Sequence, residues 1–185
     1  MLGLDELALF VERLERVGAP YMVTGATAAI LYGQPRVTND LDVVLSLDDR
    51  ARAALLQAFP ETEFYIPPES VIRTEQARPH RGHFNLIHLE SGYKADVYLT
   101  GMDALHAWAL PLRRRIALNA TITMSVAPPE YVVLRKLEYF REGNSAKHPV
   151  DIRMISTITG VDEAAMKPWL ERLGLVSLWA SVKTG

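Results

Sequence analysis

The sequence predicts an α+β fold, with a mixed β-sheet flanked by helices and a helical bundle at the C-terminus. Short apolar segments alternate with amphipathic helical segments as far as residue 127, a pattern typical of a sheet covered by helices. From Pro128-Pro129 onward the apolar residues recur only at helical spacing, and proline suits the first turn of a helix. We therefore expect a core over residues 1–127 and a helical C-terminal region over residues 128–185.

Helices and strands alternate in the first part of the chain. Apolar residues at helical spacing predict a helix over 4–17, which Gly18 ends. The apolar run 21–24 predicts a short buried strand. Gly25 then turns the chain into a helix over 26–32, whose small side chains suit close packing.

The next strand is expected at the centre of the sheet. Residues 41–45 are apolar on both faces, a pattern typical of strands that are covered on both sides. Ser46 or Asp48 is a suitable cap for the helix that follows over 48–59. A short helix is expected at 69–77, within a stretch that prolines interrupt.

A hairpin is expected in the middle of the chain. Segments 84–89 and 93–99 alternate apolar and polar residues around the turn 90–92. A short helix over 102–110 and one or two strands within 116–126 complete the core. The C-terminal helices are expected at about 130–142, 148–159, 162–173 and 175–182.

Composition excludes several classes of protein. The 185 residues include no cysteine, so disulfides, thiolate catalysis and cysteine-ligated zinc are ruled out, and the histidine spacing matches no zinc motif. The net charge of −2 provides no general attraction for nucleic acid, so RNA would have to bind a local basic patch. Residues 113–115 (Arg-Arg-Arg) form either a solvated face or an RNA phosphate contact that Arg73, Arg78 and Arg81 extend.

The N-terminal region predicts neither export nor membrane insertion. Residues 1–18 read as an acidic amphipathic helix rather than a signal peptide. No apolar run in the sequence approaches the roughly 20 residues that a membrane span needs. A cytoplasmic location without a membrane partner is therefore expected.

The strongest candidates for chemistry are Asp40 and Asp42, at the start of the expected central strand. Alternate residues of a strand point to the same face, so both carboxylates face the same way. Two adjacent carboxylates repel each other and lose hydration unless a cation lies between them, and magnesium prefers carboxylate and phosphate oxygens. The alternative is a strand end at which two acids face water.

Asp96 is the candidate third carboxylate, in the apolar segment 94–99. If this strand lies next to the first, three carboxylates converge, and two magnesium ions about 4 Å apart can bind the attacking and leaving oxygens of a phosphoryl transfer. Asp96 would also accept or orient the proton of the attacking hydroxyl. The alternative is an acid on an edge strand. Asp40, Asp42 and Asp96 are thus the candidate catalytic and metal-binding residues.

Four residues upstream of, or next to, the carboxylates are candidates for nucleotide binding. Gly25 stands between a strand and a helix, where backbone amides such as that of Ala26 can approach a phosphate, although many such turns carry glycine. Arg36 is suited to binding a phosphate or an acid, and Thr38 to fixing the loop. Ordinary loop roles are the alternative for both.

Lys136 and Asp151 are charged residues on apolar helix faces. At helical spacing Lys136 falls inside the stripe formed by Val132, Val133 and Leu137. Such a lysine must extend to solvent, pair with an acid, or face a cavity. Asp151 holds the same kind of position on the next helix. The pair is therefore either a structural salt bridge or a nucleotide site in which Lys136 reaches the triphosphate and Asp151 orients it.

Several of these residues together resemble a known signature. Gly25-Ala26, a spacer of 13 residues and Asp40-Leu41-Asp42-Val43 resemble the signature of the nucleotidyltransferase superfamily. The fuller pattern, with segments 129–137 and 147–152, is similar to the branch that includes AbiEii-type toxins and related uncharacterised bacterial proteins. Ala26 departs from the glycine or serine of the family, so only its backbone amide can contact a phosphate.

The resemblance implies a fold, a cofactor and partners. The fold is a nucleotidyltransferase-like mixed sheet flanked by helices and followed by a helical substrate region. The cofactor is Mg²⁺, with two ions, and the substrate is a nucleoside triphosphate (NTP). The toxin branch implies addition of nucleotides to RNA ends, notably tRNA, and control by an antitoxin protein, whereas other members modify proteins or antibiotics.

The sequence therefore favours a magnesium-dependent nucleotidyltransferase that transfers a nucleoside monophosphate from an NTP to an acceptor. The candidate acceptor is tRNA or another RNA, and the candidate role is the toxin of a toxin–antitoxin pair. A catalytically eroded nucleotide- or partner-binding module is the alternative, and Ala26 favours it. A metal nuclease is a third hypothesis, but the glycine turn and Lys136 favour transfer over hydrolysis.

Overall fold

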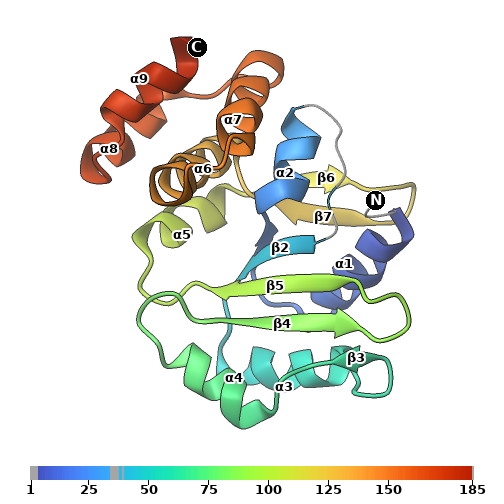
Figure 1. Ribbon diagram of the computed structural model, residues 1–185. Helices are drawn as coiled ribbons and strands as arrows, with labels where there is room; N and C mark the ends of the chain where they lie inside the picture. The colour runs from blue at the N-terminus through green and yellow to red at the C-terminus, as the bar shows by residue number, and fades with distance from the viewer. Residues whose placement is uncertain (1–3, 34–37, 39, 185) are drawn as a thin grey trace.

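The computed structural model describes residues 4–33, 38 and 40–184, which contain a seven-stranded mixed β-sheet (Figure 1). The strands are β1 (Tyr21–Val23), β2 (Asp40–Leu45), β3 (Phe64–Tyr65), β4 (His83–His88), β5 (Lys94–Leu99), β6 (Arg114–Ala117) and β7 (Thr123–Val126). Their order across the sheet is β3-β4-β5-β2-β1-β7-β6. The prediction of an α+β fold with a mixed sheet is confirmed.

Strand β2 lies at the centre of this sheet, as its apolar sequence predicts. It pairs antiparallel with β1 and parallel with β5. Leu41, Val43 and Leu45 are fully buried on one face, so the even-numbered residues of β2 share the opposite face. Strand β5 also pairs antiparallel with β4, so neither strand of the expected carboxylate site is at an edge.

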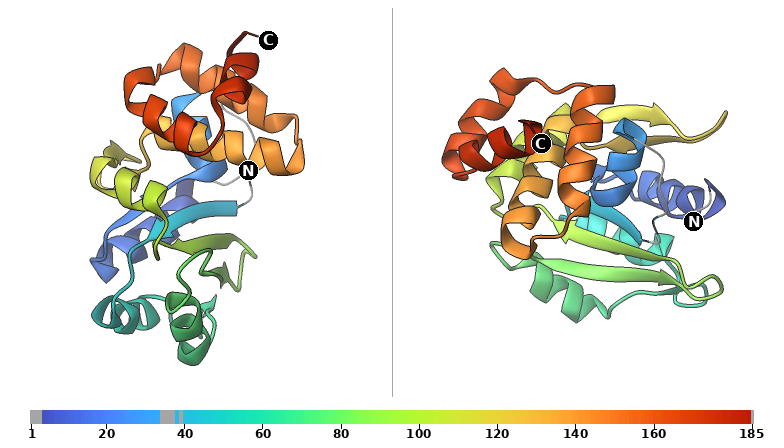
Figure 2. Two further views of the ribbon diagram at one scale, coloured as in Figure 1. Left: turned by 90° about the vertical axis from the view of Figure 1, so that its left-hand side faces the viewer. Right: turned by 45° about the horizontal axis from the view of Figure 1, so that its top comes forward.

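Helices cover both faces of the sheet. They are α1 (Leu4–Val17), α2 (Gly25–Tyr32), α3 (Asp49–Ala58), α4 (Glu69–Gln76), α5 (Ala104–Ala109), α6 (Pro129–Gly143), α7 (Lys147–Ile158), α8 (Glu163–Arg172) and α9 (Val176–Thr184). A 3₁₀ turn over Leu110–Leu112 follows α5. Helices α1 and α3 pack together behind the sheet, whereas α2, α6 and α7 pack together on its other side (Figure 2). Asp48 caps α3 by accepting a hydrogen bond of 2.7 Å from the Ala51 amide.

The C-terminal helices form one group. Helix α6 contacts α7, α8 and α9, and α7 contacts α9, which confirms the expected C-terminal bundle. The bundle also contacts α2 of the core through α6 and α7. The division of the chain at residues 127 and 128 stays a prediction. Within the described residues no helix has both the length and the apolar composition to span a membrane.

Two strands differ from the sequence prediction. Strand β3 has only two residues, too few to show any periodicity, and it is held by an aromatic cluster of Phe64 with Phe10 and Phe59. Strand β6 begins at Arg114, earlier than expected, because charged residues are accepted on the last strand of a sheet.

Candidate functional site

Three carboxylates lie on one face of the two central strands. Asp42 of β2 is the direct cross-strand partner of Asp96 of β5, and Asp40 precedes Asp42 by two residues on the same face. All three line a cavity of about 430 Å³ between the sheet and α6, which we call the first cavity. The side chain of Asp96 is 17% exposed, whereas that of Asp40 is 53% exposed at the mouth. The structure therefore brings Asp40, Asp42 and Asp96 to one cavity, and their role there stays a prediction.

The surroundings of Asp42 disfavour its ionised form when no cation is bound. Burial raises the pKa of the Asp42 carboxyl, and repulsion from Asp96 and Asp40 raises it further. A hydrogen bond from the Ala26 amide and the charge of Lys136 act in the opposite direction. The net shift is upward, so a cation bound here would stabilise the ionised form.

Gly25 is required by the close approach of Asp42. Its φ is +60°, which favours glycine, and a Cβ at this position would lie 1.8 Å from Asp42 Oδ2. The Ala26 amide donates a hydrogen bond of 3.4 Å to the same oxygen. The turn thus brings the backbone amide against the carboxylate, and both Gly25 and Ala26 line the first cavity.

Replacing Gly25 by alanine is expected to destabilise the protein by about 3 kcal/mol and to remove nucleotide binding, because Asp42 must move. Thermal melting and nucleotide titration measure the two effects. Gly18→Ala is the matched control, since Gly18 has φ +71° but nothing within 4 Å of the added Cβ. Equal losses in the two variants would show that backbone strain alone matters and would contradict the role of the Asp42 contact.

Lys136 and Asp151 form a buried ion pair between α6 and α7. Lys136 Nζ donates a hydrogen bond of 2.7 Å to Asp151 Oδ2, and the two side chains are only 6% and 9% exposed. Lys136 lines the first cavity, and its charge lowers the pKa of Asp42, whereas Asp151 is not among the lining residues. The predicted ion pair exists, and its lysine is the member that reaches the site.

Of the two loop candidates, Thr38 and Arg36, the structure describes only Thr38. Thr38 lines the first cavity, and its hydroxyl donates a hydrogen bond of 3.3 Å to the Asp40 carbonyl. Arg36 lies outside the described residues.

Two residues of β5 belong to the site although the sequence analysis did not select them. Lys94 Nζ lies 3.0 Å from Asp96 Oδ2 and 4.0 Å from Asp40 Oδ1. The Tyr98 hydroxyl donates a hydrogen bond of 3.4 Å to Asp42 Oδ1. Both alternate with Asp96 along the strand, so the two-residue period that selected Asp40 and Asp42 also identifies Lys94 and Tyr98.

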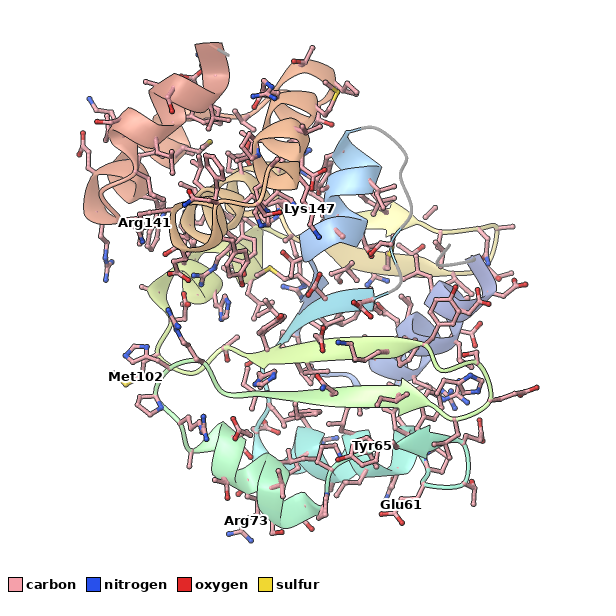
Figure 3. All side chains as sticks on the ribbon, in the orientation of Figure 1. Glu61, Tyr65, Arg73, Met102, Arg141 and Lys147 are labelled. Carbon is pink, nitrogen blue, oxygen red and sulfur yellow. The ribbon has the colours of Figure 1, made fainter. Side chains whose placement is uncertain are left out.

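Helix residues complete the cavity wall. Lys147, at the start of α7, lines the cavity and lies between the C-terminal helices and the sheet (Figure 3). Arg135 of α6 pairs with Asp103 and, at 2.8 Å, with Glu138. Burial and the charge of Arg135 lower the pKa of His106 to about 4, so this imidazole is neutral at pH 7. The contact of Arg135 with Asp103 joins residues far apart in the sequence, so no local pattern predicts it.

A second cavity of about 540 Å³ adjoins the first. Asp96, Tyr98, His106, Arg135 and Tyr139 line both cavities. A molecule in the second cavity would therefore contact the same carboxylate as a molecule in the first. The two cavities have room for one ligand each, on the two sides of Asp96.

The whole chain is similar to solved nucleotidyltransferases, although no protein-family model and no curated protein matches its sequence. One is the antibiotic-resistance factor ANT(2″)-Ia in complex with adenylyl-2″-tobramycin, with a TM-score of 0.59 and 14% identity over 95% of this chain and 98% of that chain. The fold is nucleotidyltransferase-like.

Two further structures share this nucleotidyltransferase-like fold. An antigenic nucleotidyltransferase-like protein from Paracoccidioides brasiliensis has a TM-score of 0.54 and 20% identity, over 84% of this chain and 74% of that chain. A putative nucleotidyltransferase from Thermotoga maritima has a TM-score of 0.52 and 15% identity, over 78% of this chain and 90% of that chain. At these identities the similarity establishes the fold.

The three carboxylates of this cavity fit magnesium by their chemistry. Asp40, Asp42 and Asp96 supply the oxygen ligands that Mg²⁺ prefers, and the raised pKa of Asp42 shows a carboxylate that a cation would stabilise. As placed, the described residues contain no group of three or more acidic or histidine side chains at metal-ligating separation. Lys94 lies between two of the three carboxylates instead.

The basic residues do not form one RNA-binding patch on this nucleotidyltransferase-like fold. Residues 113–115 lie at the β6 edge, and Arg115 is paired with Glu15 at 2.6 Å. Arg73 lies on α4, near the opposite edge (Figure 3), and Arg81 lies two residues before the start of β4. The interpretation of these residues as one extended patch is therefore wrong, because the sheet separates them.

Proposed function

We propose that this protein is a magnesium-dependent nucleotidyltransferase that moves a nucleoside monophosphate from an NTP to a hydroxyl of an acceptor. The observation that carries the proposal is the pairing of Asp42 with Asp96, beside Asp40, in a cavity that Gly25 and Lys136 also line. The nucleotidyltransferase-like fold supports it.

The first cavity holds the NTP in this proposal. The amides of Gly25 and Ala26, together with Lys136, bind the triphosphate, and Asp151 orients the ammonium group of Lys136 through their 2.7 Å hydrogen bond. Thr38 and Arg36 contribute from the loop before β2. Asp40, Asp42 and Asp96 hold magnesium, which neutralises phosphate charge when bound.

The second cavity holds the acceptor. The acceptor hydroxyl attacks the α-phosphorus, the bond to pyrophosphate breaks, and pyrophosphate leaves. Asp96 receives the hydroxyl proton, because it is the carboxylate that borders both cavities. The chain thus contributes mainly position and charge.

Two observations bear on the class of acceptor, and they favour different classes. The resemblance to the AbiEii-type branch implies a tRNA or other RNA end, with an antitoxin protein as regulator. The second cavity is lined by four carboxylates and three cationic side chains, which favours a small hydroxyl compound over a phosphate backbone. The carboxylates are Asp96, Asp103, Glu138 and Glu142, and the cationic residues are Arg81, Lys94 and Arg135.

The test is incubation with each of the four labelled NTPs, magnesium and a panel of acceptors that contains tRNA, total RNA and small hydroxyl compounds. We expect label transfer with release of pyrophosphate, and a loss of roughly 1000-fold in the Asp96→Asn variant. Glu61→Gln is the control. Glu61 is exposed on the side of the molecule away from the C-terminal helices (Figure 3), so this variant should keep full activity. Magnesium-linked nucleotide binding without transfer would identify the eroded binding module, and shortened, unlabelled RNA would identify a nuclease.

A further inference from the structure

Lys94 lies among Asp40, Asp42 and Asp96, which we call the carboxylate row. On β5 it is the direct cross-strand partner of Asp40, and it precedes Asp96 by two residues on the same face. Its ammonium nitrogen lies 3.0 Å from Asp96 Oδ2 and 4.0 Å from Asp40 Oδ1. One cation supplied by the chain therefore bridges two of the three acids.

The ammonium group is held in this place by the sheet. The parallel pairing of β2 with β5 fixes the position of Lys94 opposite Asp40, and the strand period fixes it beside Asp96. The ammonium group is therefore held against Asp96 Oδ2, at 3.0 Å. The side chain is 32% exposed, so most of it is packed against the sheet.

On the other side of the row, Lys136 lines the first cavity, and its ammonium group donates its 2.7 Å hydrogen bond to Asp151. Within the part of the chain that the structure describes, Asp42 accepts hydrogen bonds from the Ala26 amide and the Tyr98 hydroxyl and makes no ion pair. Asp40 is the common neighbour of Asp42 and Lys94. The row therefore has one position filled by an ammonium group, between Asp40 and Asp96, and one that still needs a cation, at Asp42.

We propose that the Lys94 ammonium replaces one of the two metal ions expected for this site, so that the protein binds a single divalent cation with each nucleotide. This inference rests on the proposed function. The single ion binds on the Asp40–Asp42 side with the triphosphate. Lys94 supplies the positive charge next to Asp96, where a second ion would be repelled by the ammonium group and would find two of its carboxylate ligands already paired.

The test counts bound ions without turnover. Mn²⁺ and each of the four α,β-methylene triphosphates are added to the protein, and protein-bound Mn²⁺ is counted by electron paramagnetic resonance against bound nucleotide. The wild-type protein is expected to bind one Mn²⁺ per nucleotide. Lys94→Met is expected to bind two, whereas Lys94→Arg, which keeps the charge, is expected to bind one.

The control is Lys183→Met, which removes a lysine from an exposed ion pair with Glu163 on the C-terminal helices and should leave the count at one. Thermal melting of every variant confirms that it is folded. Two ions in the wild type, or one ion in Lys94→Met with nucleotide still bound, would overturn the inference and leave the proposed function standing. Nucleotide binding without any Mn²⁺, or no binding by any of the proteins, would overturn the proposed function and the inference with it.

Discussion

Replacing Asp42 by asparagine is expected to reduce nucleotidyl transfer by roughly 1000-fold while making the protein more resistant to heat. Asp42 is the central carboxylate of the row, because Asp96 lies opposite it on β5 and Asp40 lies two residues before it on β2. Asparagine keeps the shape of the side chain but removes the charge that binds a cation. The same change removes the unfavourable burial of an ionised group, so the melting temperature should rise.

The sign of the stability effect follows from the pKa of Asp42. In the folded protein this pKa is raised by burial and by the neighbouring carboxylates, so ionisation is less favourable than in the unfolded chain. The wild type therefore loses stability as the pH rises through the carboxylate range, which begins at about pH 4 in an unfolded chain. Asp42→Asn does not titrate there and keeps that stability.

Melting curves at pH 3 and pH 7, with transfer assays at pH 7, check both parts of this expectation. The melting temperatures of the wild type and Asp42→Asn should differ little at pH 3, where the Asp42 carboxyl is protonated in the folded and the unfolded chain. The difference should be larger at pH 7. Glu61→Gln provides the surface control. A variant that melts below the wild type at pH 7, or that retains transfer, would contradict the role given to Asp42.

Replacing Lys136 by methionine is expected to destabilise the protein by about 3 kcal/mol, because it leaves the buried Asp151 carboxylate without its ammonium partner. For a chain of this length the melting temperature should fall by roughly 6–12 °C. Nucleotide binding should be lost as well, since Lys136 lines the first cavity. Lys183→Met is the control, because solvent screens its exposed pair with Glu163 and the melting temperature should stay close to that of the wild type.

A double variant separates the structural role of this pair from its role in binding. Lys136→Met combined with Asp151→Leu removes both buried charges, so most of the lost stability should return. Nucleotide binding should nevertheless stay absent, because the cavity still lacks the ammonium group. Recovery of nucleotide binding together with stability would show that the pair is only a structural salt bridge.

Much of the site could be predicted from local periodicity. The two-residue period of a strand placed Asp40 and Asp42 on one face, and the apolar stripe of α6 marked Lys136 as a buried charge. The apolar faces of residues 41–45 also indicated a central strand, which β2 is. These features depend on residues that are close in sequence, so the sequence contains the information directly.

Other parts of the site depend on long-range pairing, which the sequence does not encode locally. The register that places Lys94 opposite Asp40 is decided by how β2 and β5 align. The contact of Arg135 with Asp103 joins two residues that are 32 positions apart in the sequence. Strand β3 is fixed by the packing of Phe64 against Phe10 and Phe59, and two residues give no period to detect.

Tyr32, at the end of α2, limits how the molecule can admit its ligands. Its hydroxyl donates a hydrogen bond of 2.8 Å to the Ala127 carbonyl before α6, and its carbonyl accepts one of 2.5 Å from Thr159 after α7. The same residue therefore links the end of α2 to the residue before α6 and to the residue after α7. Hinge opening between the sheet and these two helices would break both bonds, so we expect ligands to enter by side-chain movements at the rim.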